Sequence, residues 1–264
     1  MKKEVLAILS VALVVVIVGC GLWLGWYALD SHHQKEDFAG LSQAFVLEKQ
    51  ETGEQPSGTA PTEETSTVTL AVSDPNTPPR HDLAALQAEN SDCVGWLTIP
   101  DTTMDYPVMF TPDEPERYLR RDFYSNPASG GTPFLDGRNT AQAEGQNLIV
   151  YGHNMLDGSM FKPIVQYLEP NFRQTHQDIY LELGGAQYRY QVLAVLETTV
   201  DSPVYRYTDL SDPAVESDFR SALFQAANLD VIHHTEGYLT LSTCGDWGGD
   251  TRVLVVAGLQ EKVD

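Results

Sequence analysis

Cysteine and basic residues are both scarce in this chain. Only 3 of the 264 residues are cysteine, and Cys20 lies inside a long apolar run. That count excludes a disulfide framework of the kind that stabilises small secreted domains. The 16 lysines and arginines face 37 acidic residues, which gives a net charge of −21. Because no basic surface is available to neutralise phosphates, nucleic acid is excluded as a partner and anionic lipid is unfavourable for the soluble part.

Charge is missing altogether from residues 5–29. As a helix this run would rise about 37 Å, enough to cross a bilayer with some tilt. A cleaved signal peptide is the alternative, but its apolar region is usually shorter and ends at a small-residue cleavage site. Here Trp23, Trp26 and Tyr27 close the run, and aromatic side chains favour the membrane interface. We therefore predict an uncleaved, single-pass transmembrane signal anchor.

The segments on either side of the anchor predict its orientation. Two lysines precede it and acidic residues follow it, so the positive-inside rule makes residues 1–4 a cytoplasmic tip and leaves the rest of the chain extracellular. Residues 30–80 are weakly helical at first and, from about residue 50, rich in Thr, Pro, Ser and Glu. Such a composition buries too little apolar surface to fold, so we predict a flexible acidic stalk over 30–80 that carries a folded head over 81–264.

Apolar periodicity in the head predicts a mainly β fold. Expected strands, several of them bounded by turn residues, cover residues 94–99, 104–110, 132–136, 147–153, 178–183, 188–200, 238–244 and 252–259. Expected helices cover 81–90, 158–168 with Ser159 as cap, and 211–228 with Ser211 or Asp212 as cap. About eight strands with helices only on the connections favour a closed or nearly closed β-barrel over alternating βαβ units.

Three side chains at predicted strand ends could carry chemistry. Cys244 ends a strand beside a Gly-rich loop, although a cysteine taken alone is more often a small buried apolar residue. A thiol needs a nearby base to react at neutral pH, and His153 follows another apolar strand. Arg252 opens the last strand, and a hairpin would bring it to the rim that holds Cys244, where its fork of donors could stabilise an oxyanion. Asp246 could orient His153 or Arg252, or could serve only the turn.

These residues stand in motifs that resemble those of a known family. The run "TLSTC", an arginine eight residues after the cysteine, the following "VLVVAG" and the upstream "YGHNM" resemble the signature of the sortases. The segments "WLTIPDTTMDYPV", "RYLRRDF" and "GTPFLDGRN" are similar to class B sortases in particular. The resemblance covers nearly all of residues 81–264 and implies a sortase-type closed eight-stranded barrel.

The resemblance also implies an activity. Sortases are membrane-anchored transpeptidases of the Gram-positive cell surface that cut a C-terminal sorting motif of secreted proteins, typically after threonine. They form a cysteine thioester and pass the acyl group to an amine on a peptidoglycan precursor or a pilin lysine. By position, Cys244 is the nucleophile, His153 the general acid and base, and Arg252 the oxyanion-stabilising group, with no metal or organic cofactor. The family groove would be lined by Ser242, Thr243, Leu119, Val204 and Tyr205.

Several alternatives stay open at the level of sequence. Within class B, a pilin-polymerising enzyme would use the same site as one that anchors proteins to the cell wall. A tethered cysteine peptidase would resolve the thioester with water, although such peptidases usually place the cysteine before the histidine along the chain. A non-catalytic surface binding domain, in which Cys244 is inert, belongs to a different class altogether.

Overall fold

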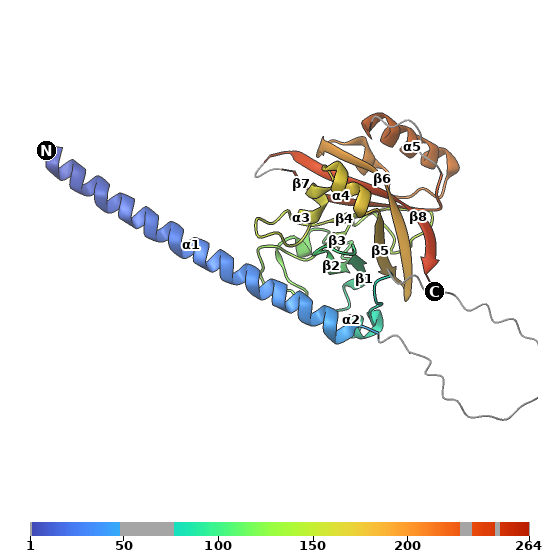
Figure 1. Cartoon of the computed structure of the whole chain (residues 1–264), viewed down its shortest axis with the longest axis horizontal. Helices are drawn as coiled ribbons and strands as arrows, with labels where there is room; N and C mark the ends of the chain where they lie inside the picture. The colour runs from blue at the N-terminus through green and yellow to red at the C-terminus, as the bar shows by residue number, and fades with distance from the viewer. Residues whose placement is uncertain (1, 48–76, 228–233, 246–248, 264) are drawn as a thin grey trace, which may run out of the picture.

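The computed structural model describes residues 2–47, 77–227, 234–245 and 249–263, and its head is a closed barrel of eight strands (Figure 1). The strands are β1 (Cys93–Thr98), β2 (Asp105–Met109), β3 (Phe134–Leu135), β4 (Asn147–Tyr151), β5 (Asp178–Leu183), β6 (Ala186–Thr199), β7 (Tyr238–Cys244) and β8 (Thr251–Val263). Around the barrel they run β1-β2-β3-β4-β7-β8-β6-β5. The β2–β3 and β4–β7 pairs are parallel and the others antiparallel. The predicted closed eight-stranded barrel is confirmed.

Local turn chemistry fixes the register of the β5–β6 hairpin. Strands β5 and β6 are joined by Gly184 and Gly185, both with positive φ (56° and 80°), and Leu183 pairs directly with Ala186. Two consecutive positive φ angles suit a tight two-residue hairpin turn, a conformation that glycine adopts without steric cost.

Apolar side chains form two cores. The larger includes the barrel interior, where Trp96, Leu148 and Val255 are fully buried. The smaller lies under α5 (Pro213–Ala227), whose Phe219 and Leu223 are fully buried in a cluster with residues of β6, β7 and β8. Helix α5 begins where the sequence predicted, and Asp212, rather than Ser211, caps it by accepting a 2.8 Å hydrogen bond from the Ala214 amide.

The remaining helical segments are short. They are α2 (Leu83–Glu89), η1 (Arg117–Arg120), α3 (Lys162–Gln166), α4 (Pro170–Thr175) and η2 (Pro203–Arg206). The helix expected over 158–168 is confirmed only in its middle, and Ser159 does not cap it. The Ser159 hydroxyl instead donates to Asp157 at 2.6 Å, because the chain between them forms a turn before the helix starts.

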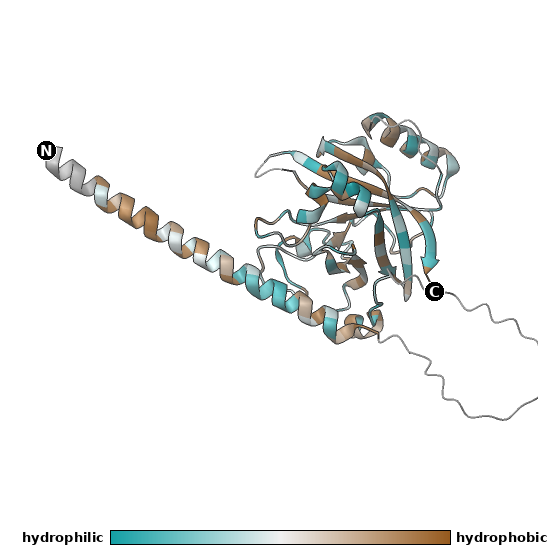
Figure 2. Cartoon of the chain, viewed as in Figure 1, coloured by the Kyte–Doolittle hydropathy of each residue, from teal (hydrophilic) through white to brown (hydrophobic). Residues whose placement is uncertain are grey.

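Helix α1 (Lys2–Phe45) is longer than the sequence suggested. From Leu9 to Phe45 it is long and apolar enough to cross a membrane, with apolar residues gathered in its outer half and polar ones beside the head (Figure 2). Residues 31–45 were expected to be weakly helical at best, and that expectation is wrong. Phe38 and Leu41 are each only 4% exposed because they pack in the main core. This tertiary burial stabilises the helix beyond its weak propensity.

The end of α1 meets the start of the head. Val46 forms a β-bridge with His81, and the Leu47 amide donates to the Arg80 carbonyl at 2.7 Å. Within the predicted stalk, residues up to Phe45 are therefore helical and joined to the head. Residues 48–76 lie outside the described residues, so the flexible stalk stays a prediction there.

Candidate active site

One parallel strand pair brings the candidate histidine and cysteine to the same edge of the barrel. Tyr151, the last residue of β4, pairs with Ser242 of β7. His153 and Cys244 each lie two residues further along their strands. Parallel strands of matched register end at the same edge, so the two side chains belong to one rim, and both line the same cavity.

The neighbouring hairpin adds the arginine. Cys244 and Arg252 are direct partners in the antiparallel β7–β8 ladder. The Arg252 guanidinium donates through Nη1 to the carbonyls of Thr251 (2.9 Å) and Gly249 (3.2 Å). Its Nε and Nη2 make no hydrogen bond within the described part of the chain. These donors could serve a developing oxyanion at the rim.

Close packing fixes the backbone that carries the histidine. A Cβ at Gly152 would come within 2.4 Å of the fully buried ring of Phe161, so the glycine of "YGH" is required by space. The Thr243 hydroxyl donates to the Gly152 carbonyl at 2.8 Å, and the Asn154 amide donates to the Cys244 carbonyl at 3.0 Å. The chain around His153 is thus bonded to the strand that bears Cys244.

The rim opens into a cavity of about 710 Å³. Besides Cys244, His153 and Arg252, four of the residues expected in a groove line it, namely Leu119, Tyr205, Ser242 and Thr243. Val204 does not: it is fully buried and packs in the smaller core with α5, so its expected groove role is wrong. Asp246 lies outside the described residues.

Comparison with known proteins agrees with this geometry. The family model described as "Sortase domain" matches residues 97–260, more than half of the chain. The chain belongs to the sortase family. Sortase B of Listeria monocytogenes is 31% identical over 91% of this chain and 92% of its own. The structure of sortase B from B. anthracis covers 88% of this chain and 99% of its own with a TM-score of 0.66 at 27% identity. A substrate complex of Staphylococcus aureus sortase B covers 68% and 84% with a TM-score of 0.61 at 28% identity. These relatives place the chain in class B.

The electrostatic environment of this sortase favours a neutral histidine. Burial lowers the pKa of His153, and the positive charge of Arg120 lowers it further. A contact with the Gly130 backbone acts in the opposite direction but does not reverse the shift. At neutral pH the ring is therefore uncharged and able to accept a proton from a thiol.

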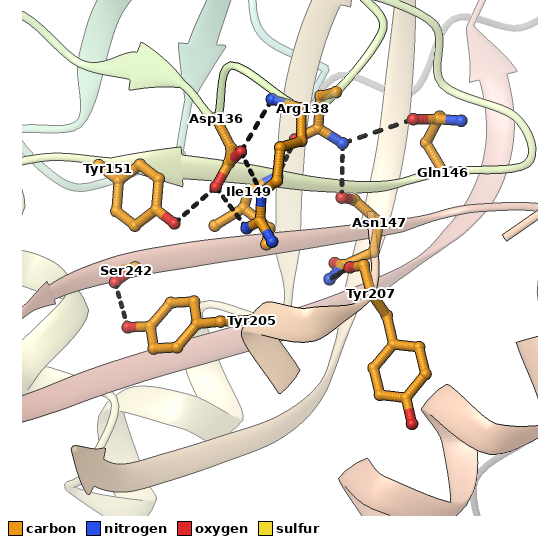
Figure 3. A network of polar contacts seen from close by, with 10 residues as sticks. Asp136, Arg138, Gln146, Asn147, Ile149, Tyr151, Tyr205, Tyr207 and Ser242 are labelled. Carbon is orange, nitrogen blue, oxygen red and sulfur yellow. Dashed lines mark hydrogen bonds and ion pairs between the residues drawn. The ribbon is translucent and has the colours of Figure 1, made fainter. Parts of the chain in front are cut away.

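Tyr205 links the cavity wall to β7, the strand that ends at Cys244. Its hydroxyl lies 2.7 Å from Ser242 Oγ (Figure 3), and its ring is stacked on that of Tyr151 with 6.3 Å between centroids. Burial raises the pKa of Tyr205, with smaller electrostatic effects from Arg252 and Cys244. Because burial raises its pKa, the phenol stays protonated at neutral pH and can donate a hydrogen bond.

Sequence reasoning missed a polar network in the cavity wall of this sortase. Asp136 lies between Arg138 and Tyr151 (Figure 3): Arg138 Nε and Nη2 donate to its two oxygens at 2.8 and 2.7 Å, and the Tyr151 hydroxyl donates at 2.8 Å. Burial would raise the pKa of Asp136, but these hydrogen bonds outweigh it and hold the pKa below its usual value. All three residues line the cavity. The "FLDGRN" segment contains Asp136 and Arg138 and was interpreted as a strand end within a family-like motif, but no local signal tied it to Tyr151.

Proposed function

We propose that this sortase cleaves a C-terminal sorting motif of secreted proteins, after its threonine, and transfers the acyl group to an amine of a cell-wall precursor. The observation that carries the proposal is the joint placement of Cys244, His153 and Arg252 on one rim of the cavity. Leu119, Tyr205, Ser242 and Thr243 line the groove beside them, and we assign to them the binding of the motif.

The reaction proceeds by two acyl transfers. Neutral His153 takes the proton of the Cys244 thiol, and Sγ attacks the scissile carbonyl carbon. Arg252 donates hydrogen bonds to the oxyanion, and the C–N bond breaks as the imidazolium protonates the leaving amine. The acceptor amine then gives its proton to His153 as its nitrogen attacks the thioester, and the thiolate leaves. The imidazolium returns this proton to the Cys244 thiolate, which restores the thiol and the neutral histidine, so atoms and charge balance.

The apolar half of α1 supports placement at the cell membrane. We assign residues 5–29 as the single transmembrane span, residues 1–4 as the cytoplasmic tip and the barrel to the extracellular side, because lysines precede the span and acidic residues follow it. An extracellular barrel would meet its protein substrates and the cell-wall amine on the same side of the membrane.

Family membership favours a transpeptidase over the tethered peptidase and the inert binding domain. The discriminating experiment incubates the full-length enzyme in detergent with a panel of sorting-motif peptides, with and without triglycine, and follows products by mass. We expect a peptide adduct on Cys244 that is released onto triglycine, and loss of both products in Cys244→Ala. Product formed at the same rate without the amine would identify a peptidase.

Cys93 provides an internal control for thiol reactivity. It is fully buried, and burial raises its pKa to about 12, so it should resist alkylation in the folded enzyme. Cys244 is half-buried and lines the cavity. Peptide mapping after brief iodoacetamide treatment should find the label on Cys244 and not on Cys93. An unreactive Cys244, together with no adduct from any peptide, would contradict the proposed function.

A further inference from the structure

The loop that carries His153, residues 152–161, lies between the nucleophile strand and helix α1. On its inner side it is bonded to β7 through Thr243 and Asn154, as described above. Its outer side faces the part of α1 that follows the apolar span. There the Lys35 ammonium pairs with the Asp157 carboxylate at 2.7 Å and donates to the Asp157 carbonyl at 3.1 Å, and the Ser31 hydroxyl donates to the same carboxylate.

Asp157 is the anchor of this loop. Its carboxylate also accepts hydrogen bonds from the Ser159 amide at 3.1 Å and hydroxyl at 2.6 Å. Burial would raise its pKa, but the hydrogen bonds from Lys35, Ser159 and Ser31 lower it to about 2. The carboxylate therefore remains charged, and its contacts with α1 intact, throughout the pH range in which the enzyme works.

A second contact from α1 reaches the His153 ring through the backbone. Gln34, only 7% exposed, accepts a hydrogen bond from the Gly130 amide at 3.0 Å and donates to the Gly131 carbonyl at 3.4 Å. Asp30 accepts a 3.0 Å hydrogen bond from the Ser129 amide just before them. Gly130 also packs against this loop, because a Cβ built on it would lie 3.2 Å from Met160 and 3.5 Å from Met155, and its backbone acts to raise the pKa of His153. One turn of α1 thus supports both segments that surround the histidine.

We propose that α1 from Asp30 to Lys35 positions His153 for catalysis, with Gln34 as the positioning residue. Gln34 holds the Gly130 backbone against the ring, while Asp157 fixes the loop that carries it. The inference rests on the proposed role of His153. Gln34 is outside the set of residues that line the catalytic cavity, so it acts through the histidine and not on the substrate.

The cost of losing this contact follows from its burial. Gln34→Ala would leave the Gly130 amide and the Gly131 carbonyl, both in buried residues, without their side-chain partner, which is unfavourable for buried polar groups. The segment would shift to find new partners. Because a displacement of about 1 Å can reduce a rate by about a hundredfold, we expect about a tenfold fall in kcat for Gln34→Ala and little change in KM.

A matched control comes from the same helix. Ser42, two turns further along α1, donates to the Asp105 carboxylate of β2 at 2.6 Å. It also joins α1 to the barrel, and it lines the same small cavity as Asp157 and Ser159, but its hydrogen bond goes to β2 and not to the His153 loop. Ser42→Ala should therefore lower the melting temperature, as Gln34→Ala does, and leave kcat unchanged. Lys35→Met, which keeps the aliphatic stem and loses the ion pair to Asp157, gives a second test that does not disturb a buried amide.

The experiment measures the histidine as well as the rate. Full-length enzyme in detergent, labelled with ¹³C-histidine, would be titrated by NMR, with the His153 resonance assigned by His153→Gln. In Gln34→Ala we expect that resonance to shift and its titration midpoint to move to lower pH, since the Gly130 contact that favours the charged ring weakens. Lys35→Met should also shift the resonance and lower kcat. Ser42→Ala should change neither.

Two results would overturn the inference. One is an unshifted His153 resonance, together with a kcat within twofold of wild type, in both Gln34→Ala and Lys35→Met. The other is an equal effect from Ser42→Ala, which would mean that α1 only stabilises the barrel. The NMR titration needs no turnover, so it separates failure of this inference from failure of the proposed function, which would appear as a wild-type enzyme without an adduct on Cys244.

Discussion

Cys244 and Arg252 face each other as direct partners across the β7–β8 ladder. This register gives the proposed nucleophile a fixed cationic neighbour without any contribution from loop geometry. Both residues are half-buried at the rim of the barrel, so substitutions at either position should change catalysis more than folding.

Arg252→Lys should lose most of the activity. A lysine ammonium keeps the charge but cannot present the planar fork of donors, and the loss of one oxyanion donor typically reduces kcat by about 10²–10³. The measurement is kcat for transfer of a motif peptide to triglycine, with the melting temperature as the folding control. Near wild-type turnover in Arg252→Lys would remove the oxyanion role assigned to this residue.

The acid limb of the pH profile should depend on Arg120. His153 must be neutral to accept the thiol proton, and its pKa lies below the ordinary 6.5, so kcat/KM should fall only at pH values below 6.5. Arg120→Gln removes a charge that disfavours the imidazolium. The pKa of His153 should then rise, and the acid limb should move to higher pH.

Arg121→Gln is the control for that shift. Arg121 is adjacent in sequence, but its guanidinium donates to the Ser125 carbonyl at 2.8 Å, and it does not contribute to the shift of the His153 pKa. The acid limb of the kcat/KM profile of Arg121→Gln should match that of wild type. Equal profiles for wild type, Arg120→Gln and Arg121→Gln would show that the acid limb reports a group other than His153.

Tyr205→Phe should weaken substrate binding. The substitution keeps the ring stacked on Tyr151 and removes the hydroxyl that lies 2.7 Å from Ser242 Oγ. A hydrogen bond of this kind contributes about 0.5–1.5 kcal/mol, so KM should rise by about two- to tenfold. Tyr207→Phe is the control, because Tyr207 packs on Phe219 in the smaller core. An unchanged KM in Tyr205→Phe would separate this hydroxyl from motif recognition.

Replacement of residues 48–76 by about five Gly and Ser residues should leave the enzyme folded and active. Val46 and His81 already pair at the base of this segment, and a shorter closed loop costs less entropy, by about 1 kcal/mol for this change in length. The melting temperature in detergent and the transfer rate in proteoliposomes are the two measurements. A marked loss of either would assign these residues a role beyond connection.

Sequence patterns predicted the barrel because each strand carries its own signal. The run from Tyr238 to Cys244, the glycine-rich turn and the run from Arg252 are a local hairpin, so both the strands and the meeting of Cys244 with Arg252 could be expected. The same reasoning placed His153 at a strand end. That His153 and Cys244 lie close together follows from the β4–β7 pairing, which joins strands about ninety residues apart. No local pattern predicts that pairing, and only the resemblance to a family implied it.

The sequence analysis did not predict that residues 31–45 of α1 form a helix packed on the head, although their apolar spacing carries a signal. Gln34, Phe38, Leu41 and Phe45 recur at spacings of 4, 3 and 4, which is the pattern of one helical face. The polar residues between them and the charge-free anchor before them obscured that stripe. The partners of this face include the Gly130 amide for Gln34 and the Tyr106 ring for Phe38, both distant in sequence, and no local pattern identifies them.

Val204 and Asp136 illustrate the limits of a motif. The η2 segment was expected to present both Val204 and Tyr205 to the groove. Adjacent residues on a tight helical turn point in different directions, and Val204 packs in the smaller core with α5. Asp136 carried no signal of its own because its partners Arg138 and Tyr151 meet only when β3 and β4 pair. Side-chain direction, more than element position, is what the sequence left undetermined.

The bridge between Val46 and His81 has a consequence for proteolysis. A protease that cuts between residues 48 and 76 would convert the polypeptide into two fragments, the shorter one ending soon after α1. The Val46–His81 bridge and the contacts of Asp30, Gln34 and Lys35 all lie outside that interval, so the fragments would remain a non-covalent pair. A nicked enzyme should therefore stay attached to the cell surface and run as two bands only after denaturation.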